Sequence, residues 1–414
     1  MKSNATIMKC PECGKEYPVD SLAVRCEKCN QPIEVLYDYK SLSDTITRKS
    51  FRNRDWTTWR YRELLPIRDE TNIVSLHEGG VPLIKSHRLT EIIGIKNLYL
   101  KDETRNPTMS FKDIGTTVGI TKALEVGASA VGCVTTGNMG ASVSAYSAKA
   151  GIKCIILVPS QTPVEKITQI LVHGALVLAV NLPYPELYKM SFEMNRKFGV
   201  YLVHADSPMR VEGQKTTAFE LCEQLNWKIP DVVLIPTSSG GYLSAIWKGF
   251  KEFYEIGFIN RLPRIVCIQG EGCAPIVKAF KEGKTDTEVW PNPHTIAHAI
   301  SNQDPSLASS RRVLKILAKS KGTAEAVSDE EISNAQKLLA IKEGIFAEPA
   351  SAAPIAGLKK LIEKGLIDKN ESATCIITGS GLKDVESALK ICEKTITVDS
   401  WDEFRKKLGK IIEK

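Results

Sequence analysis

The spacing of apolar and polar positions alternates between two patterns from about residue 75 onward. Short runs of β-branched and apolar residues predict strands at 97–100, 130–134, 154–158, 176–180, 201–204, 232–235, 264–269 and 374–377. The stretches between them repeat their apolar positions with a helical period, and they predict helices at 110–125, 140–150, 163–173, 212–225, 241–254, 329–343 and 351–364. The longest apolar runs, 154–158 and 175–180, predict buried strands. This alternation predicts an α/β fold with largely parallel sheets.

The two ends of the chain follow different patterns. Residues 36–74 carry many charges and aromatic side chains without a clear period, and they predict an arm over the main body. The last residues, 400–414, predict an amphipathic helix that packs on the body or forms a dimer contact. We therefore expect an N-terminal unit at 1–35, the arm at 36–74, a large domain at 75–119 and 206–392, a small domain at 120–205 and a C-terminal helix at 393–414.

Length and composition indicate the class of protein. The 414 residues suffice for two or three domains, and shares of 43% hydrophobic and 25% charged residues are typical of soluble globular proteins. No apolar run approaches the roughly 20 residues that cross a bilayer, and no secretory signal precedes the first cysteine motif, so we expect a cytoplasmic protein without membrane contact. The net charge of +7 is spread along the chain, which permits an anionic substrate and does not require nucleic acid.

Four of the eleven cysteines form a tight N-terminal set. Cys10 and Cys13 make one CxxC pair, and Cys26 and Cys29 make a second pair after twelve intervening residues. Four thiolates in two chelating pairs favour a tetrahedral zinc site, with an iron centre or an empty site as the alternatives. Because few basic and aromatic residues accompany the motif, a structural zinc ribbon is favoured over a nucleic-acid-binding one. The other seven cysteines are scattered among mostly apolar neighbours, which is typical of a reducing compartment.

Four predicted strand-to-helix junctions carry groups suited to chemistry, and parallel α/β sheets bind ligands at such junctions. In the first, Pro107 interrupts the chain, and Ser110 can cap a helix that begins near Lys112. The positive end of a helix disfavours a cation in its first turn, so the neutral, nucleophilic form of this lysine gains population. The second junction, 135–142, combines small residues with the side-chain amide of Asn138, so that backbone amides can approach an anion there.

The third and fourth junctions add a phosphate site and a hydroxyl group. The third follows the strand 232–235 and joins hydroxyls to paired glycines at a helix start, which suits a phosphate. It lacks the Gly-Lys-Ser/Thr ending of a nucleotide P-loop. The fourth begins with Thr378, whose hydroxyl can hydrogen-bond a neutral ring nitrogen. Together the junctions predict one site for a phosphorylated aromatic aldehyde, in which the phosphate-binding residues are Ser238, Ser239, Gly240, Gly241 and Tyr242.

Several of these motifs resemble those of the fold type II pyridoxal phosphate enzymes, and most closely those of the threonine synthases. The resemblance rests on residues 77–83, 110–113, 136–138, 212–216, 348–352 and 378–384, and it covers roughly residues 75–392. Some microbial members of this family also carry an N-terminal zinc ribbon. The resemblance implies two parallel-sheet domains, the larger of which binds pyridoxal phosphate, preceded by a small zinc ribbon with four cysteine ligands.

The resemblance also implies roles for individual residues. Lys112 would form the Schiff base with pyridoxal phosphate and carry protons, and Phe111 would lie beside it in the cofactor site. Asn138 would bind the phenolic oxygen, Ser238–Tyr242 the phosphate, and Thr378 the pyridine nitrogen. The implied reaction is that of a lyase in threonine biosynthesis, which converts O-phospho-L-homoserine and water into L-threonine and phosphate. The substrate-binding residues would be Thr135, Met139, His204 and Arg210.

The sequence departs from the family's usual pattern on the substrate side. Met139 and Gly140 stand where hydroxyl residues are usual, and His204 and Ala205 replace an Asn-Ser pair upstream of Arg210. These departures keep two alternatives open. One is a serine/threonine dehydratase or a synthase that uses O-phosphoserine, and the other is a non-catalytic protein that binds pyridoxal phosphate. The expected partners are a small, phosphorylated amino acid and a second copy of the chain in a homodimer.

Overall fold

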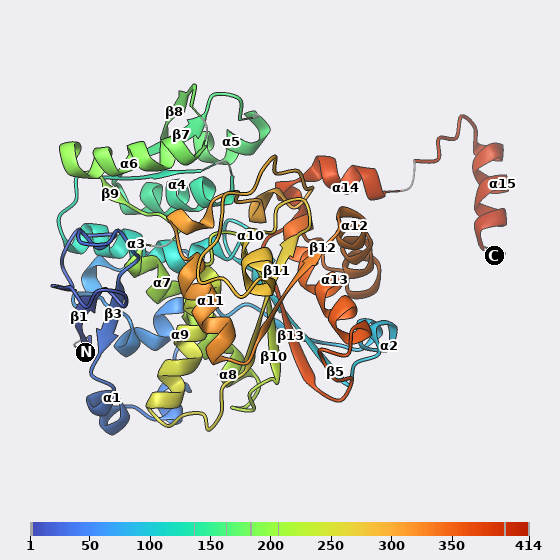
Figure 1. Ribbon diagram of the computed structural model, residues 1–414. Coiled ribbons are helices and arrows are strands. Elements are labelled where there is room, and N and C mark those ends of the chain that lie inside the picture. Colours follow the sequence, from blue (N-terminus) through green and yellow to red (C-terminus); the bar gives the residue numbers. More distant parts are fainter. Residues whose placement is uncertain are drawn as a thin grey trace.

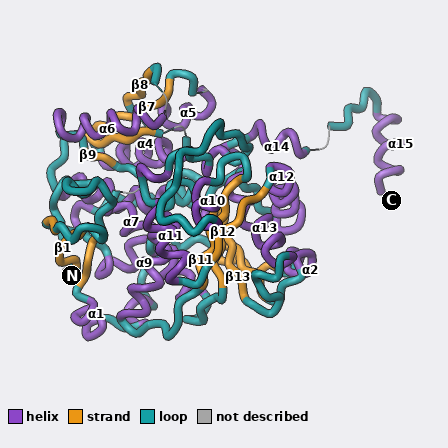
Figure 2. Tube along the Cα trace, viewed as in Figure 1, coloured by secondary structure: helices purple, strands orange, loops and turns teal. Residues whose placement is uncertain are grey.

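Three β-sheets, formed by different parts of the sequence, organise the structure (Figure 1). The structure is a computed structural model, and it describes residues 3–135, 137–162, 164–182, 184–205, 207–392 and 395–412. The strands of the largest sheet run through the middle of the body, with helices on both sides (Figure 2). The predicted α/β architecture with parallel strands is confirmed.

The largest sheet has six strands in the order β12-β11-β10-β13-β5-β4. Every neighbouring pair of these strands is parallel except β4 and β5. Successive residues of β10 enter two different cores: Val232 and Leu234 face one, and Val233 and Ile235 face the other. Such a strand reads as a continuous apolar run because helices cover both faces of the sheet. The strands are β4 (Leu83–Ser86), β5 (Asn97–Asp102), β10 (Val232–Pro236), β11 (Arg264–Gly270), β12 (Thr323–Val327) and β13 (Ser372–Ile377).

Several helices accompany the strands of the largest sheet. The helix predicted at 212–225 is two helices that meet at Lys215, and the one predicted at 329–343 is an α-helix followed by a π-helical turn, Leu339–Glu343. Four further helices, α2, α10, α11 and α14, were not predicted. The helices are α2 (Arg88–Ile93), α8 (Thr216–Gln224), α9 (Gly241–Glu255), α10 (Pro275–Lys281), α11 (Ser310–Lys319), α12 (Asp329–Leu338), α13 (Pro349–Glu363) and α14 (Val385–Ile391).

A smaller, all-parallel sheet has four strands in the order β8-β7-β6-β9. The prediction that the run 175–180 is a buried strand is wrong: Leu176 is 57% exposed and Leu178 is 42% exposed. The reason is that β8 pairs with β7 alone and forms an edge of the sheet. The elements are β6 (Ala130–Val134), β7 (Lys153–Pro159), β8 (Leu176–Val180), β9 (Tyr201–Leu202), α4 (Asn138–Ala150), α5 (Val164–Val172) and α6 (Tyr184–Phe198), of which α6 was not predicted.

The N-terminal sheet has the order β2-β1-β3, formed by β1 (Ala5–Lys9), β2 (Glu16–Tyr17) and β3 (Glu34–Tyr37). A buried ionic network joins it to the body. The Tyr37 hydroxyl donates to Glu212 at 2.8 Å, and Lys215 forms ion pairs of 2.5 Å with Glu212 and 2.7 Å with Glu252. Because an unpaired buried charge is costly, this network holds β3 firmly against α7 (Pro208–Gln214) and α9.

The predicted arm continues from β3 and lies over the body. It contains α1 (Tyr39–Thr45) and three 3-10 turns, Arg48–Phe51, Thr58–Leu64 and Glu70–Asn72. Phe51 and Tyr61 are fully buried and make ring contacts with Phe219 and Phe253. Phe51 and Tyr61, which belong to no period in the sequence, thus attach the arm to α8 and α9.

The last helix, α15 (Trp401–Ile412), lies apart from the body in Figure 1, and none of its residues is buried. The alternative in which this helix packs on its own chain is therefore wrong for the structure described. The predicted domain boundaries stay a prediction, and position 206 at one of them lies outside the described residues. Within the described part of the chain, no helix combines the length and apolar character that crossing a membrane requires.

Helices α3 (Lys112–Glu125) and α7 pass between the two larger sheets in close contact. A Cβ atom at Gly213 of α7 would lie 2.1 Å from the carbonyl oxygen of Ile114, and one at Gly115 of α3 would lie 2.9 Å from that of Arg210. Only glycine allows the two backbones to approach so closely. The contact therefore sets the distance between the first turn of α3 and the first turn of α7.

We predict that Gly213→Ala lowers the free energy of unfolding by about 1–3 kcal/mol, because the added methyl group overpacks a contact made by backbone atoms. Urea unfolding followed by circular dichroism measures the change. Gly409→Ala is the matched control, since an added Cβ there meets nothing within 4 Å. Equal midpoints for Gly213→Ala and the unsubstituted protein would contradict the prediction.

Candidate active site

A cavity of about 730 Å³ lies between the two larger sheets. The ends of β6, β10 and β13 and the starts of α3, α4 and α9 contribute to its wall. All the residues that the sequence predicts to bind cofactor or substrate line this one cavity: Phe111, Lys112, Thr135, Asn138, Met139, His204, Arg210, Ser238, Ser239, Gly240, Gly241, Tyr242 and Thr378. Thr136, which belongs to the motif 136–138 that ends with Asn138, lies outside the described residues.

Lys112 is the first residue of α3 and projects into this cavity. The residue before the helix is Phe111, which makes no side-chain cap bond, and the Ser110 hydroxyl accepts a hydrogen bond from the Lys112 backbone N–H at 3.3 Å, as the predicted capping role requires. Burial, together with the positive charge of Arg210, lowers the pKa of Lys112 to about 7. An amine with such a pKa is largely neutral at slightly alkaline pH and therefore nucleophilic.

Asn138 begins α4 on the opposite side of the cavity. Its side-chain amide donates to both carboxylate oxygens of Glu348, each at 3.1 Å. Burial raises the pKa of Glu348, and the hydrogen bond from Asn138 opposes that rise. The pair joins α4 of the smaller sheet to the start of α13 beside the largest sheet. Glu348 thereby orients the amide of Asn138.

Thr378 directly follows β13. Its hydroxyl and that of Ser351 lie 2.7 Å apart, and Ser351 also accepts from the backbone N–H of Gly379 at 2.7 Å. This arrangement restricts the rotation of the Thr378 hydroxyl at the wall of the cavity. A neutral hydroxyl there is suited to a neutral ring nitrogen, because it can donate to the nitrogen without transferring a proton.

The segment 238–242 follows β10 and leads into α9, which begins at Gly241 without a side-chain cap from any described residue. Gly240 has a left-handed φ of +89°, and a Cβ on it would lie 2.4 Å from Val313. The first N–H groups of α9 lack intrahelical acceptors, as at every helix start, and they lie at the cavity wall, where they suit an anion. Ser239 is held from outside the loop, since its hydroxyl accepts from the Asn302 amide at 2.9 Å.

The side chain of Tyr242 serves the site indirectly. Its ring stacks on Phe111 with a centroid distance of 4.0 Å, and its hydroxyl is hydrogen-bonded to Glu103 and Thr217. The centroid of the Phe111 ring in turn lies 4.1 Å from the amine of Lys112. The backbone amide of Tyr242 is suited to a phosphate. Its ring supports the Phe111 ring, which lies beside the Lys112 amine.

Three of the four predicted substrate residues, Thr135, Met139 and His204, come from the ends of β6 and β9 and from α4, and Arg210 comes from α7. Thr135 accepts hydrogen bonds from the backbone of Gly137 and Gly140, and Met139 is only 8% exposed in the core of the small sheet. The His204 ring contacts the Ser191 hydroxyl at 2.7 Å. The backbone carbonyl oxygen of His204 accepts a hydrogen bond from the Arg210 guanidinium at 3.1 Å. His204 and Arg210 thus form one hydrogen-bonded corner.

Sequence reasoning assigned no role to two polar residues of the cavity that join its sides. Lys383, which follows β13, donates to the side-chain oxygen of Gln169 in α5, and burial lowers the pKa of Lys383. Lys383 lies in the motif 378–384, which offered a signal. Gln169 offered none, because a single polar residue on an amphipathic helix is usually solvated.

This set of residues fits pyridoxal phosphate. The cofactor has an aldehyde, a ring nitrogen, a phenolic oxygen and a phosphate. The cavity offers the desolvated amine of Lys112, the Thr378 hydroxyl, the Asn138 amide and the uncapped start of α9. Each polar group of the cofactor therefore has a chemically suited residue on the cavity wall.

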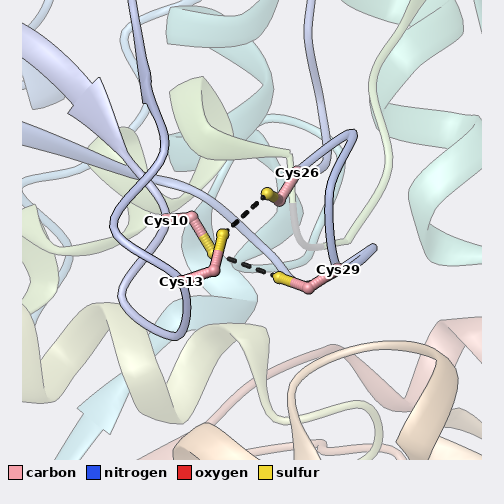
Figure 3. A group of neighbouring side chains, drawn as sticks. All are labelled: Cys10, Cys13, Cys26 and Cys29. Carbon is pink, nitrogen blue, oxygen red and sulfur yellow. Dashed lines mark hydrogen bonds between the residues drawn. The ribbon is translucent and has the colours of Figure 1, made fainter.

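The four N-terminal cysteines form a separate cluster (Figure 3). Their sulfur atoms lie within 4.8 Å of one another, and the pairs Cys10–Cys29 and Cys13–Cys26 are 3.4 Å apart. Zinc–thiolate bonds of about 2.3 Å in a tetrahedron place sulfurs within about 4 Å of one another. The cluster is the one group of potential metal ligands found among the described residues.

Comparison with known proteins shows extensive similarity. Residues 74–379 match the model of the family described as pyridoxal-phosphate dependent enzymes. The chain is 47% identical over 394 residues to a threonine synthase of Methanocaldococcus jannaschii, which is 95% of this chain and 96% of that relative. It is 43% identical over 394 residues to a threonine synthase of Methanosarcina acetivorans, with the same coverage.

Solved structures share the fold at low sequence identity. The processed form of threonine deaminase isoform 2 from Solanum lycopersicum matches with a TM-score of 0.64 and 23% identity, over 75% of this chain and 86% of its own. A fungal L-serine ammonia-lyase from Rhizomucor miehei matches with a TM-score of 0.65 and 19% identity, over 75% of this chain and 96% of its own. These similarities show the fold alone.

We predict that, in protein freed of cofactor, Lys112 reacts with an amine-directed acylating reagent at a rate that rises with pH and is half-maximal near pH 7. Its lowered pKa makes the amine neutral above that pH, whereas exposed lysines become neutral only near pH 10. Mass spectrometry of the labelled peptide gives the profile for each lysine. A profile for Lys112 that coincides with those of exposed lysines would refute the lowered pKa.

Proposed function

The chain belongs to the pyridoxal-phosphate dependent enzyme family, and from this premise we propose that it converts O-phospho-L-homoserine and water into L-threonine and phosphate. The proposal is supported by relatives named threonine synthase that are 43–47% identical over nearly the whole length of both chains. The observation on the site that carries it is the grouping of Lys112, Arg210 and Lys383 in one cavity. Arg210 and Lys383 offer positive charge to the anionic groups of such a substrate, and Lys112 offers the amine that carries the cofactor.

When bound, the cofactor supplies an electron sink that lets protons leave the carbon atoms next to the substrate's amino group. We propose that Lys112 carries the cofactor, that Asn138 and Thr378 contact its ring, and that Ser238–Tyr242 hold its phosphate. The uncapped start of α9 supports the last assignment, because it offers N–H groups and a favourable helix dipole to a phosphate.

Lys112 is also the proposed proton carrier of the reaction. Its pKa of about 7 lets Nζ accept and return a proton at little cost near neutral pH. In the balanced reaction, the Cγ–O bond and one Cβ–H bond break, and phosphate leaves with the electron pair of the Cγ–O bond. Cγ gains a hydrogen, the hydroxyl of water bonds to Cβ, and the remaining proton of water goes to phosphate. Lys112 Nζ is the basic group of the cavity that can move protons between Cα, Cβ and Cγ along this path.

We propose that Arg210 and Lys383 attract the substrate phosphate. Both line the cavity, and they approach it from α7 and from the segment after β13. The carbonyl oxygen of His204 accepts from the guanidinium of Arg210 and orients it, and a planar guanidinium matches the geometry of a phosphate. This arrangement offers a replacement for the hydroxyl and amide groups that the family usually has beside Arg210.

We predict that the purified protein releases phosphate and threonine in equal amounts from O-phospho-L-homoserine, and that Lys112→Ala reduces the rate by at least about 10³-fold. Coupled phosphate detection and amino-acid chromatography measure the two products. Free L-homoserine, free L-serine and O-phospho-L-serine are the comparison substrates. Preferential release of ammonia or phosphate from serine compounds would instead establish the dehydratase or O-phosphoserine alternative.

We propose that the four-cysteine cluster binds one structural zinc ion. Two of its ligands, Cys10 and Cys26, are buried, and the Tyr17 hydroxyl donates to the sulfur of Cys26 at 3.5 Å. Hydrogen bonds to thiolate ligands fix their direction, as is common around structural metals. A closed set of four protein ligands leaves no position for a substrate, so the proposed role is structural.

We predict one zinc ion per chain by atomic-emission analysis, and a content below about 0.2 per chain in Cys13→Ser with Cys29→Ser. The double substitution removes one ligand from each CxxC pair, so neither pair can chelate. Cys392→Ser is the matched control, because Cys392 is an exposed free thiol outside the cluster. Iron in place of zinc would establish the alternative metal.

We also propose that the protein is a cytoplasmic homodimer. The described cysteines outside the cluster are free thiols, and all but Cys392 are buried, which suits a reducing compartment. For the dimer, the support is α15, whose Trp401, Phe404 and Ile411 are exposed on the single chain. A second copy of the chain is the proposed partner of that surface.

A further inference from the structure

Arg25 connects three segments that are far apart in the sequence. It directly precedes Cys26 in the metal ribbon, by which we mean residues 5–37, and it is 8% exposed. One terminal nitrogen donates to the carbonyl oxygen of Asn30 at 2.7 Å within the ribbon. The other donates to the carbonyl oxygen of Leu307 and to the Tyr188 hydroxyl, the latter at 3.3 Å. In the sequence, Leu307 lies between β11 and β12, two strands of the largest sheet. Tyr188 belongs to α6, which packs on the small sheet.

On the small-sheet side, packed rings lead from Arg25 to the cavity. The guanidinium carbon lies 5.9 Å from the ring centroids of both Tyr188 and Phe192. These two rings contact the His204 ring at centroid distances of 4.8 and 5.6 Å. His204 lines the cavity and accepts the hydrogen bond from Arg210. A continuous series of contacts therefore joins the metal ribbon to the proposed substrate corner.

On the other side, a shorter path leads from Arg25 to the proposed phosphate loop. Leu307 ends the 3-10 turn Pro305–Leu307, and two residues later the backbone N–H of Ser309 donates to the carbonyl oxygen of Ser239 at 3.1 Å. The ribbon makes a second contact with this region, because Arg312 of α11 donates to the carbonyl oxygen of Pro32 at 3.0 Å. The metal ribbon thus contacts both the rings that lead to His204 and the segment that supports Ser239.

We propose that Arg25 is a positioning residue that holds α6 and the segment 305–309 at a fixed separation and thereby places His204 and Arg210 for the substrate. Arginine suits this role because its planar fork donates in several directions at once and its face stacks on aromatic rings. A lysine offers a single charged point and cannot make the same set of contacts. The effect on substrate binding rests on the proposed function, whereas the effect on α6 does not.

The test compares Arg25→Ala and Arg25→Lys with Lys28→Ala, which removes an exposed positive charge from the same turn of the ribbon. We expect both Arg25 variants to raise KM for O-phospho-L-homoserine on the order of tenfold, with kcat changed less than about twofold. The absorbance of the lysine-linked cofactor and the zinc content should match those of Lys28→Ala. Hydrogen exchange should accelerate in 184–198 and leave α13 unchanged.

Several outcomes would overturn the proposal. They are an unchanged KM with normal exchange in 184–198, a loss of kcat and of thermal stability without a change in KM, and full rescue by Arg25→Lys. If Arg25→Ala fails to fold, Tyr188→Leu removes the next contact of the series and must raise KM in the same way. If the unsubstituted protein does not act on O-phospho-L-homoserine, the proposed function fails, and the exchange of 184–198 still decides whether Arg25 holds α6.

Discussion

The close backbone contact between α3 and α7 is the constraint on which the site depends. Gly115 and Gly213 let the two helices approach until side-chain atoms have no room between them. Lys112 lies at the start of α3, and Arg210 lies in the first turn of α7. The separation of their backbones follows from this contact. The lowered pKa of Lys112 depends on the same contact, because Arg210 is one of its causes.

Two buried lysines show how the structure gives one residue type different properties. Burial acts to lower the pKa of Lys248, but Glu212 and Glu252 together outweigh it, and the pKa is raised. Burial lowers the pKa of Lys112 most, and the positive charge of Arg210 lowers it further than the carboxylate of Glu348 raises it, so that it falls to about 7. The first lysine is a fixed cation that attaches the metal ribbon to the body. The second has the lowered pKa of a nucleophilic amine, and the balance between burial and the charged neighbours distinguishes the two lysines.

The strands of the larger sheets were largely predictable from the sequence, because a buried parallel strand is a short apolar run with few alternatives. The run 130–134 and the strand β6 coincide, and the predicted phosphate-binding segment 238–242 begins two residues after the end of β10. The prediction failed where pairing decides exposure. The residues of β8 are as apolar as those of a core strand, yet β8 is an exposed edge. The strand β12 was missed, because Thr323–Val327 contains a glutamate whose charge is paired with lysines.

The sequence by itself determined which candidate groups meet at the site, because local motifs at strand ends specify residue types and because parallel strands bring those ends to one edge. It therefore supplied Lys112, Asn138, Thr378 and the glycines of the phosphate loop. Tertiary structure alone decided what surrounds them. Glu348 orients Asn138 across 210 positions of the chain, and Arg25 reaches α6 across 163. No local pattern records such contacts, because they arise only when separate elements pack, and packing also sets the local dielectric that tunes the reactive amine.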